Sequence, residues 1–238
     1  MRKRIASVLL AFLVSACASG EPGEGQLIAD PYENVNREIH SFNKGIDTAV
    51  VNPASKAYDF VTPALGKFLI SNALSHLTLP GAFANHVMQG DLGDAGETLA
   101  RFTLNTVLGA AGFLDPATEF GADYIETDFG LTLAEWGVGT GAFLELPLFG
   151  PSTTRDAVGR VVDSIFVPTG YLVGSDVVWG VRALDLLDTR DRYRALIDDV
   201  LYESEDSYRA SRNAYIQNRR SVQAGETQIE ALPDIFIE

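Results

Sequence analysis

The chain has 238 residues and a formal net charge of −14, with 18 Lys and Arg residues against 32 Asp and Glu. A chain this acidic, without a concentrated basic stripe, is a poor general binder of nucleic acid, so we expect no nucleic-acid partner. Its one cysteine and three scattered histidines give no disulfide framework and no metal-ligand pattern, and we expect neither a metal nor a cofactor.

The N-terminus has the three regions of a bacterial lipoprotein signal. Residues 2–4 are basic, residues 5–12 are apolar, and the sequence Val-Ser-Ala-Cys then ends at Cys17. We expect residues 1–16 to be removed and Cys17 to be lipidated. The alternative is an ordinary signal peptide with a chance cysteine, but Cys17 stands at the one position where lipidation needs it.

Composition divides the rest of the chain into three parts. Residues 17–29 are predicted to form the lipidated cysteine and a flexible tether, because they are poor in apolar residues. A single helical domain is predicted over residues 30–220, followed by a loose polar tail at residues 221–238. Ala18 follows the cysteine, where Asp tends to retain such lipoproteins at the inner membrane, so we expect the outer membrane.

Amphipathic helices dominate the first half of the body. Apolar residues recur at helical spacing between residues 35 and 50, until Pro53 ends or restarts the helix. A second helix is predicted over residues 63–77, and a break at Pro80-Gly81 separates it from a short helix that reaches Val87. The apolar stripe of the first helix is Val35, Ile39, Phe42, Ile46 and Val50, and that of a third helix is Leu92, Ala95, Leu99, Phe102, Thr106 and Val107.

No further stretch is predicted to span a membrane. The longest one without a formal charge, residues 68–90, contains amides, histidines and the Pro80-Gly81 break, so it cannot cross a bilayer as one helix. Packed against protein, it is suited to the membrane interface.

Residues 128–163 are rich in glycine. They begin as a short helix, break at Gly137 and run extended to Gly150-Pro151. A new helix then starts with Ser152, Thr153 or Thr154 as its cap. From residue 179 to about residue 220 the chain is charged and helical, with a restart near Asp206. We find no convincing strand alternation, and the predicted fold class is all-α.

The glycine-rich stretch combines small residues with apolar ones, so that apolar groups can approach its backbone closely. We predict that it forms a lining and not a catalytic loop. The alternative is that its glycines only allow tight helix packing. The candidate lining residues are Trp136, Gly137, Gly139, Gly141, Phe143, Leu146 and Phe149.

Patterns of enzyme chemistry are lacking. The sequence has neither the HExxH pattern of zinc proteases nor the GxSxG elbow of serine hydrolases, and we predict no catalytic residue and no enzyme activity. Asp156 and Asp163 lie close in sequence to Arg155 and Arg160, and their spacing favours pairing within one helix over acid–base catalysis.

Ten blocks, in this order, resemble the MlaA (VacJ) family of outer-membrane lipoproteins. The resemblance covers about residues 30–220, and the lipoprotein signal agrees with it independently. The blocks are residues 30–33 (DPYE), 36–43 (NREIHSFN), 89–91 (QGD), 101–109 (RFTLNTVLG), 112–115 (GFLD), 128–133 (DFGLTL), 136–141 (WGVGTG), 146–147 (LP), 150–153 (GPST) and 155–156 (RD).

The resemblance implies a function that the residues alone do not supply. It implies a ring-like, multi-helix single domain with interfacial helices broken by Gly and Pro and a central amphipathic channel. The glycine-rich stretch would help to line this lipid channel. The resemblance also implies a lipid-anchored position at the inner leaflet on the periplasmic side of the outer membrane. Such proteins remove mislocalised phospholipids from the outer leaflet, pass them to a periplasmic carrier and associate with a trimeric porin. The alternative is a structural envelope lipoprotein that scaffolds porins without lipid transfer.

Overall fold

The computed structural model describes residues 27–166 and 175–225, which leaves Cys17 and most of the predicted tail outside it. Within those residues the chain is mostly helical, which confirms the predicted fold class. The elements are α2 (Glu33–Ile46), the π-helix η2 (Asp47–Val51), α3 (Asn52–Val61), α4 (Ala64–Gln89), α5 (Leu92–Val107), α6 (Pro116–Glu119), α7 (Phe129–Glu135), β1 (Phe143–Leu146), β2 (Gly150–Thr153), α8 (Thr154–Phe166), α10 (Ser175–Arg192), α11 (Arg194–Asp198), the π-helix η3 (Asp199–Glu203) and α12 (Ser207–Gln223).

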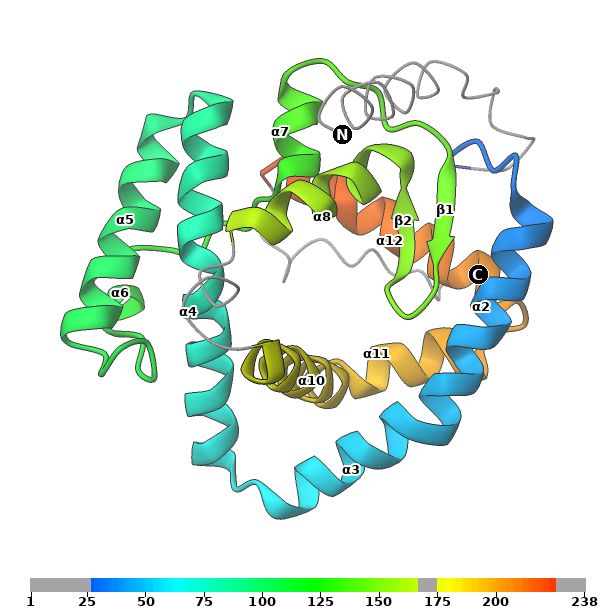
Figure 1. Ribbon diagram of the computed structural model, residues 1–238, viewed down its shortest axis with the longest axis horizontal. Helices are drawn as coiled ribbons and strands as arrows, with labels where there is room; N and C mark the ends of the chain where they lie inside the picture. Colours follow the sequence, from blue (N-terminus) through cyan, green and yellow to red (C-terminus); the bar gives the residue numbers. More distant parts are fainter. Residues whose placement is uncertain (1–26, 167–174, 226–238) are drawn as a thin grey trace.

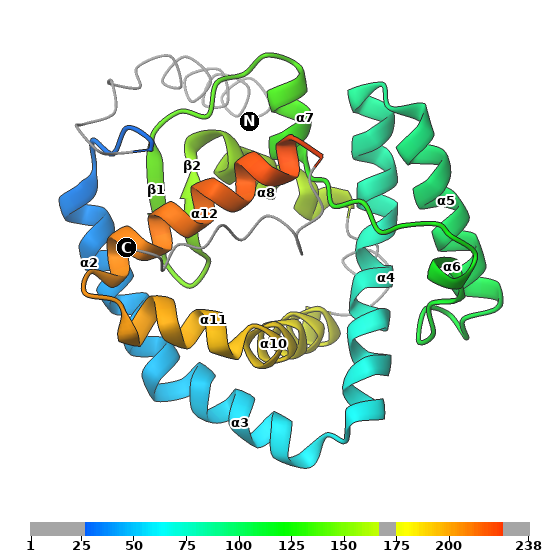
Figure 2. The same ribbon diagram turned by 180° about the vertical axis from the view of Figure 1, so that it is seen from behind.

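The elements are arranged in a closed circuit (Figures 1 and 2). The helices α2, α3 and α4 form three of its sides, and α7, α8 and the hairpin of β1 and β2 complete it. The helices α5 and α6 lie outside this circuit, along α4. The helices α10 and α11 run beside α3, and α12 crosses behind the hairpin in Figure 1. An outline of this kind agrees with the predicted ring, whereas the central channel stays a prediction.

The first two helices are joined without a loop. The sequence predicts that Pro53 ends or restarts the helix, and α3 begins at Asn52 with this proline in its first turn. The intervening turn is π-helical, since the backbone N–H of Asn52 donates to the carbonyl of Asp47, five residues earlier. Proline is tolerated there because the first turn of a helix needs no donor at that position.

The predicted break at Pro80-Gly81 is wrong. Residues Ala64–Gln89 form one helix of 26 residues with Pro80 inside it. A proline removes one backbone donor and crowds the preceding turn, but Leu79 and Ala82 on either side of it are buried, and that packing holds the helix together. The helix ends at Gly90, whose φ is 84°. No helix in the described part of the chain is long and apolar enough to cross a membrane.

The expectation of no strands is also wrong. Residues Phe143–Leu146 pair with residues Gly150–Thr153 in an antiparallel hairpin, with Phe143 opposite Thr153 and Leu146 opposite Gly150. The inward positions of β1 are Phe143 and Glu145. A buried glutamate hides the alternation of apolar and polar residues by which a half-buried strand is recognised.

Buried residues lie beyond both ends of the predicted helical domain. Ile28 and Ala29, assigned to the tether, are buried, and Ile28 packs with Phe143, Tyr208 and Ile216 in an apolar cluster. At the other end α12 continues to Gln223, and Ser221 is buried. Ile28 and Ala29 therefore belong to the core. Two apolar residues are enough to attach the end of an otherwise polar segment to it.

The crossing of α7 and α8 yields a stability prediction. A Cβ added to Gly159 would lie 2.5 Å from the backbone N of Gly130 and 2.8 Å from its Cα, so backbone would have to move. We expect Gly159→Ala to lower the free energy of unfolding by about 1–3 kcal/mol, the usual cost of overpacking. Gly96→Ala is the matched control, since a Cβ there meets open space within α5. Denaturant unfolding in detergent measures both, and an unchanged midpoint for Gly159→Ala would contradict the close crossing.

Candidate functional site

The helix α2 turns its apolar side outward. Val35 and Phe42, both in the predicted apolar stripe, are 60% and 52% exposed. The buried residues of this helix are instead polar, namely Asn36 and His40. In a water-soluble protein an amphipathic helix buries its apolar stripe, so α2 has the opposite orientation.

The helix α5 has the same orientation. Leu92 is 74% exposed and Leu99 is 49% exposed, whereas Arg101 and Asn105 are buried on the opposite side. Arg101 pairs with Asp115 at 2.7 Å, which compensates its burial. Of the predicted stripe, Ala95 is buried with the polar side, whereas Leu92, Leu99, Phe102 and Val107 are exposed. The sequence does not reveal which way the stripe faces.

Further exposed apolar side chains lie on four more helices. Exposed apolar surface of this extent is typical of a membrane or protein interaction site. Exposed residues on α3, α4, α8 and α10 include Phe60, Val61, Leu65, Phe68, Val161, Ile165, Trp179 and Leu186. These helices therefore carry surface that is suited to an apolar environment.

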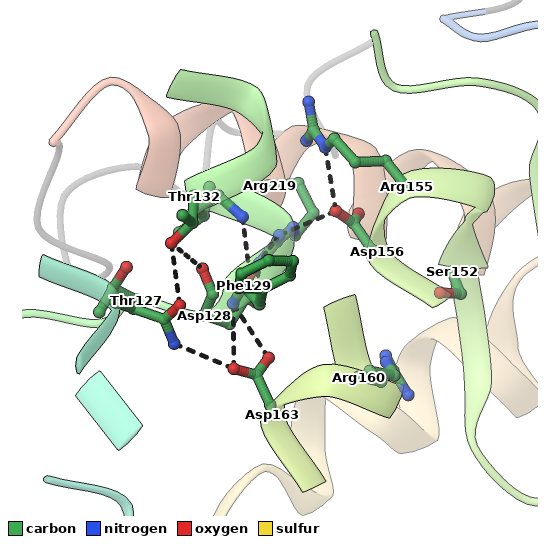
Figure 3. A network of polar contacts seen from close by, with 12 residues as sticks. Thr127, Asp128, Phe129, Thr132, Ser152, Arg155, Asp156, Arg160, Asp163 and Arg219 are labelled. Carbon is green, nitrogen blue, oxygen red and sulfur yellow. Dashed lines mark hydrogen bonds and ion pairs between the residues drawn. The ribbon is translucent and has the colours of Figure 1, made fainter. Parts of the chain in front are cut away.

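Arg219 of α12 is the centre of the polar interior (Figure 3). Its guanidinium donates to Asp128 at 2.6 and 3.1 Å and to Asp156 at 3.0 Å. Tyr215, one turn earlier, donates to Asp156 at 2.7 Å. Burial acts to raise the pKa of Asp156, but Arg219 and the Tyr215 hydroxyl outweigh it and hold that pKa below its usual value. One arginine thus joins α12 to the start of α7 and to α8.

A second polar group joins α8 to α4 and α7. Asp163 accepts the backbone N–H of Phe129 at 3.0 and 3.1 Å and the amide of Asn85 at 2.9 Å. Asn85 in turn accepts the hydroxyl of Thr132 at 2.9 Å, and Gln89 donates to the same hydroxyl oxygen at 2.9 Å. Burial raises the pKa of Asp163, which these hydrogen bonds only partly offset.

The predicted pairing of charges within one helix is therefore wrong. Asp156 and Asp163 bond mainly to other elements, and Arg160 donates to the carbonyls of Phe149 and Pro151 in the hairpin at 3.2 and 3.3 Å. Only the sequence neighbours Arg155 and Asp156 pair locally, at 3.3 Å. Spacing within a helix does not reveal that another helix supplies a closer partner.

A third polar group fixes the start of the domain. Asp30 pairs with Arg212 of α12 at 2.7 Å and accepts the amide of Asn36 at 2.9 Å. Asn36 also donates to the carbonyl of Phe143 at 3.2 Å and accepts the backbone N–H of Glu145 at 3.0 Å. One asparagine therefore joins α2, β1 and the segment before α2.

The predicted lining residues do not gather on one surface. Phe143 is fully buried in the apolar cluster, and Gly141 is packed so closely that a Cβ would lie 2.9 Å from Thr154. Gly141 therefore fits the alternative explanation, tight packing. The others are more accessible. Gly137 and Gly139 have open space around them, Trp136 and Phe149 are exposed, and Leu146 is half-buried.

The structure also brings together residues that the sequence did not connect. His40 Nε2 lies 3.1 Å from Ser207 Oγ, and His40 Nδ1 lies 3.5 Å from Glu145 Oε1. They come from α2, α12 and β1, more than 100 residues apart in places, and no local motif announces them. No cluster of His, Asp and Glu in the described ranges is arranged to hold a metal ion.

Comparison with known proteins assigns the chain to a family. The model of the MlaA lipoprotein family matches residues 28–222. The chain belongs to the MlaA lipoprotein family. It is 31% identical to the intermembrane phospholipid transport system lipoprotein MlaA of Shigella flexneri, over 94% of this chain and 90% of that one. The Haemophilus influenzae protein of the same name is 30% identical, over 98% and 96%.

A solved structure supports the assignment. It comes from a study of the structural basis for maintenance of bacterial outer membrane lipid asymmetry, has a TM-score of 0.73 and is 30% identical, covering 82% of this chain and 99% of that one. The MlaA resemblance blocks supply much of the polar interior described above. Asp30, Asn36, Arg101, Asp128 and Asp156 all lie in them, and each bonds to a segment other than its own.

Removal of the Arg219 side chain should destabilise the MlaA domain. We expect Arg219→Met to lower the free energy of unfolding by about 3–5 kcal/mol, because it leaves the buried Asp156 without its main cation. Arg209→Met is the matched control on the same helix, since its exposed side chain pairs with Asp206 at 3.3 Å and should cost at most about 1 kcal/mol. Chemical denaturation of both variants in detergent measures the difference in stability. Equal losses of stability in the two variants would contradict the central structural role of Arg219.

Proposed function

We propose that this protein is an outer-membrane lipoprotein component of an intermembrane phospholipid transport system. It removes mislocalised phospholipids from the outer leaflet and passes them to a periplasmic carrier, which maintains lipid asymmetry. The observation that carries the proposal is the outward orientation of the apolar helix faces around a polar interior. The names of the relatives, and the subject of the study behind the similar structure, support it.

The outward apolar faces suit a position within one leaflet. Burial of exposed apolar area in the acyl region gains about 25 cal/mol per Å², whereas the same area in water would promote aggregation. Acyl chains on Cys17 would hold the domain at the inner leaflet, facing the periplasm.

The passage itself is proposed to run through the circuit of helices. A phospholipid needs polar groups for its head and accessible apolar groups for its tails. Gly137 and Gly139 offer open backbone beside the exposed Trp136, and these residues are the proposed part of the lining. A trimeric porin and the periplasmic carrier are the proposed partners, and no catalytic step is required.

The competing function is a structural lipoprotein that scaffolds porins without moving lipid. The experiment that separates the two compares outer-leaflet phospholipid in cells with and without the protein, labelled by an amine-reactive reagent that does not cross the outer membrane. We expect deletion to raise the labelled phospholipid, and the wild-type gene to restore it. An unchanged level on deletion would favour the scaffold.

Two variants sharpen that experiment. Cys17→Ala should leave a folded domain that fails to restore asymmetry, because the anchor is lost. Gly139→Leu should reach the membrane normally but restore asymmetry poorly, since Gly139 has room for a side chain and its bulk would fill the passage. Gly96→Leu, also in open space but on α5, is the control. Full restoration of asymmetry by Gly139→Leu would contradict the proposal that this residue lines the passage.

A further inference from the structure

An open pocket of about 670 Å³ lies between α2 and the start of α12. Three basic side chains line it, those of Arg37, Lys44 and Arg209, together with the carboxylates of Glu205 and Asp206. A concentration of basic groups is unusual in a chain whose net charge is −14. The pairing of these groups decides what the pocket can bind.

Asp206 is the counter-ion of two of the three basic side chains. Arg37 grips its carboxylate with two bonds of 2.9 and 3.1 Å, and Arg209 approaches it to 3.3 Å. The hydrogen bond from Arg37 is the main cause that lowers the pKa of Asp206 to about 2. Asp206 therefore stays ionised at neutral pH, and the two arginines are held in place by it.

Lys44 is the cation that remains. Its Nζ lies 3.5 Å from Ser207 Oγ and 5.5 Å from the centre of the Tyr202 ring. Within residues 27–166 and 175–225 it forms no ion pair with a carboxylate. An ammonium without a counter-ion in a pocket is a binding group for an anion.

The Ser207 hydroxyl beside Lys44 is fixed by a buried relay. His40 Nε2 lies 3.1 Å from Ser207 Oγ, and Glu145 holds the other ring nitrogen at 3.5 Å. His40 and Glu145 are only 5% and 3% exposed, so neither can swing away easily. When both ring nitrogens carry hydrogen, Nδ1–H faces the Glu145 carboxylate and Nε2–H donates to Ser207 Oγ, which leaves the serine hydrogen for a ligand.

We propose that this pocket binds a phosphate group, with Lys44 as its charge partner and the Ser207 hydroxyl as a second donor. Phosphate offers several acceptor oxygens and a negative charge, which matches a cation beside a hydroxyl. The inference rests on the proposed function for the source of that phosphate, a phospholipid headgroup. It extends that function because it assigns the headgroup to a place between α2 and the start of α12.

The test measures binding of a short-chain phosphatidic acid, and of the matching diacylglycerol, to the purified full-length lipoprotein in detergent. We expect Lys44→Gln to raise the Kd for the phosphatidic acid by roughly tenfold, the usual scale for a charge-assisted hydrogen bond. Affinity for the diacylglycerol should not change. Lys56→Gln is the matched control, because it removes the same charge from an exposed position on α3. Lys44→Arg should retain most of the affinity.

Each outcome decides between the alternatives. Competition by inorganic phosphate in the wild type but not in Lys44→Gln supports the phosphate site. Equal phosphatidic acid affinity in Lys44→Gln and wild type overturns the site and leaves the proposed transport function standing. Binding of inorganic phosphate without any lipid binding overturns the lipid source and the transport function together. Release of fatty acid, lost in Ser207→Ala, would overturn simple binding, because serine, histidine and glutamate also form hydrolase triads.

Discussion

The fold depends on buried ion pairs that join helices distant in sequence. Arg219 reaches the buried Asp156 and also the half-exposed Asp128, and Arg212 reaches the buried Asp30. Breaking such a pair leaves an uncompensated charge in a medium of low dielectric constant, which costs several kcal/mol. These pairs, together with a small apolar cluster around Phe143, hold α12 against the start and the middle of the chain.

The polar interior explains why apolar side chains are exposed on the surface. When polar side chains occupy the inner faces of α2 and α5, the apolar stripes of those helices have no core to enter. They face outward, where water would make them costly and acyl chains would not. A small core suffices because the chain does not fold by apolar burial alone.

The sequence predicts local features such as helix caps well, but it does not predict which side of a helix is buried. Thr153 accepts the backbone N–H of Asp156 at 3.1 Å and Asp206 accepts that of Arg209 at 3.2 Å, so the predicted cap of α8 and the restart near Asp206 are confirmed. Both depend on neighbours within three residues. The course of α4 through Pro80 and the hairpin at Glu145 depend on packing across the fold, which periodicity does not encode. For the candidate site, the sequence showed which apolar and small residues were available. The burial of Phe143 and the hydrogen-bond partners of Asp163 could be seen only in the tertiary structure.

The most direct measurement tests whether the outward apolar faces contact acyl chains. The lipoprotein is reconstituted into phospholipid vesicles with a nitroxide label at Phe42→Cys or, as a matched neighbour on the same helix, at Ser41→Cys. Cys17 is the only natural cysteine, and its acylation leaves each added cysteine as the sole labelling site. We predict that the label at residue 42 is relaxed by oxygen and protected from a water-soluble nickel chelate, and that the label at residue 41 shows the reverse. Equal access of the chelate to both labels would contradict an apolar surface embedded in the membrane.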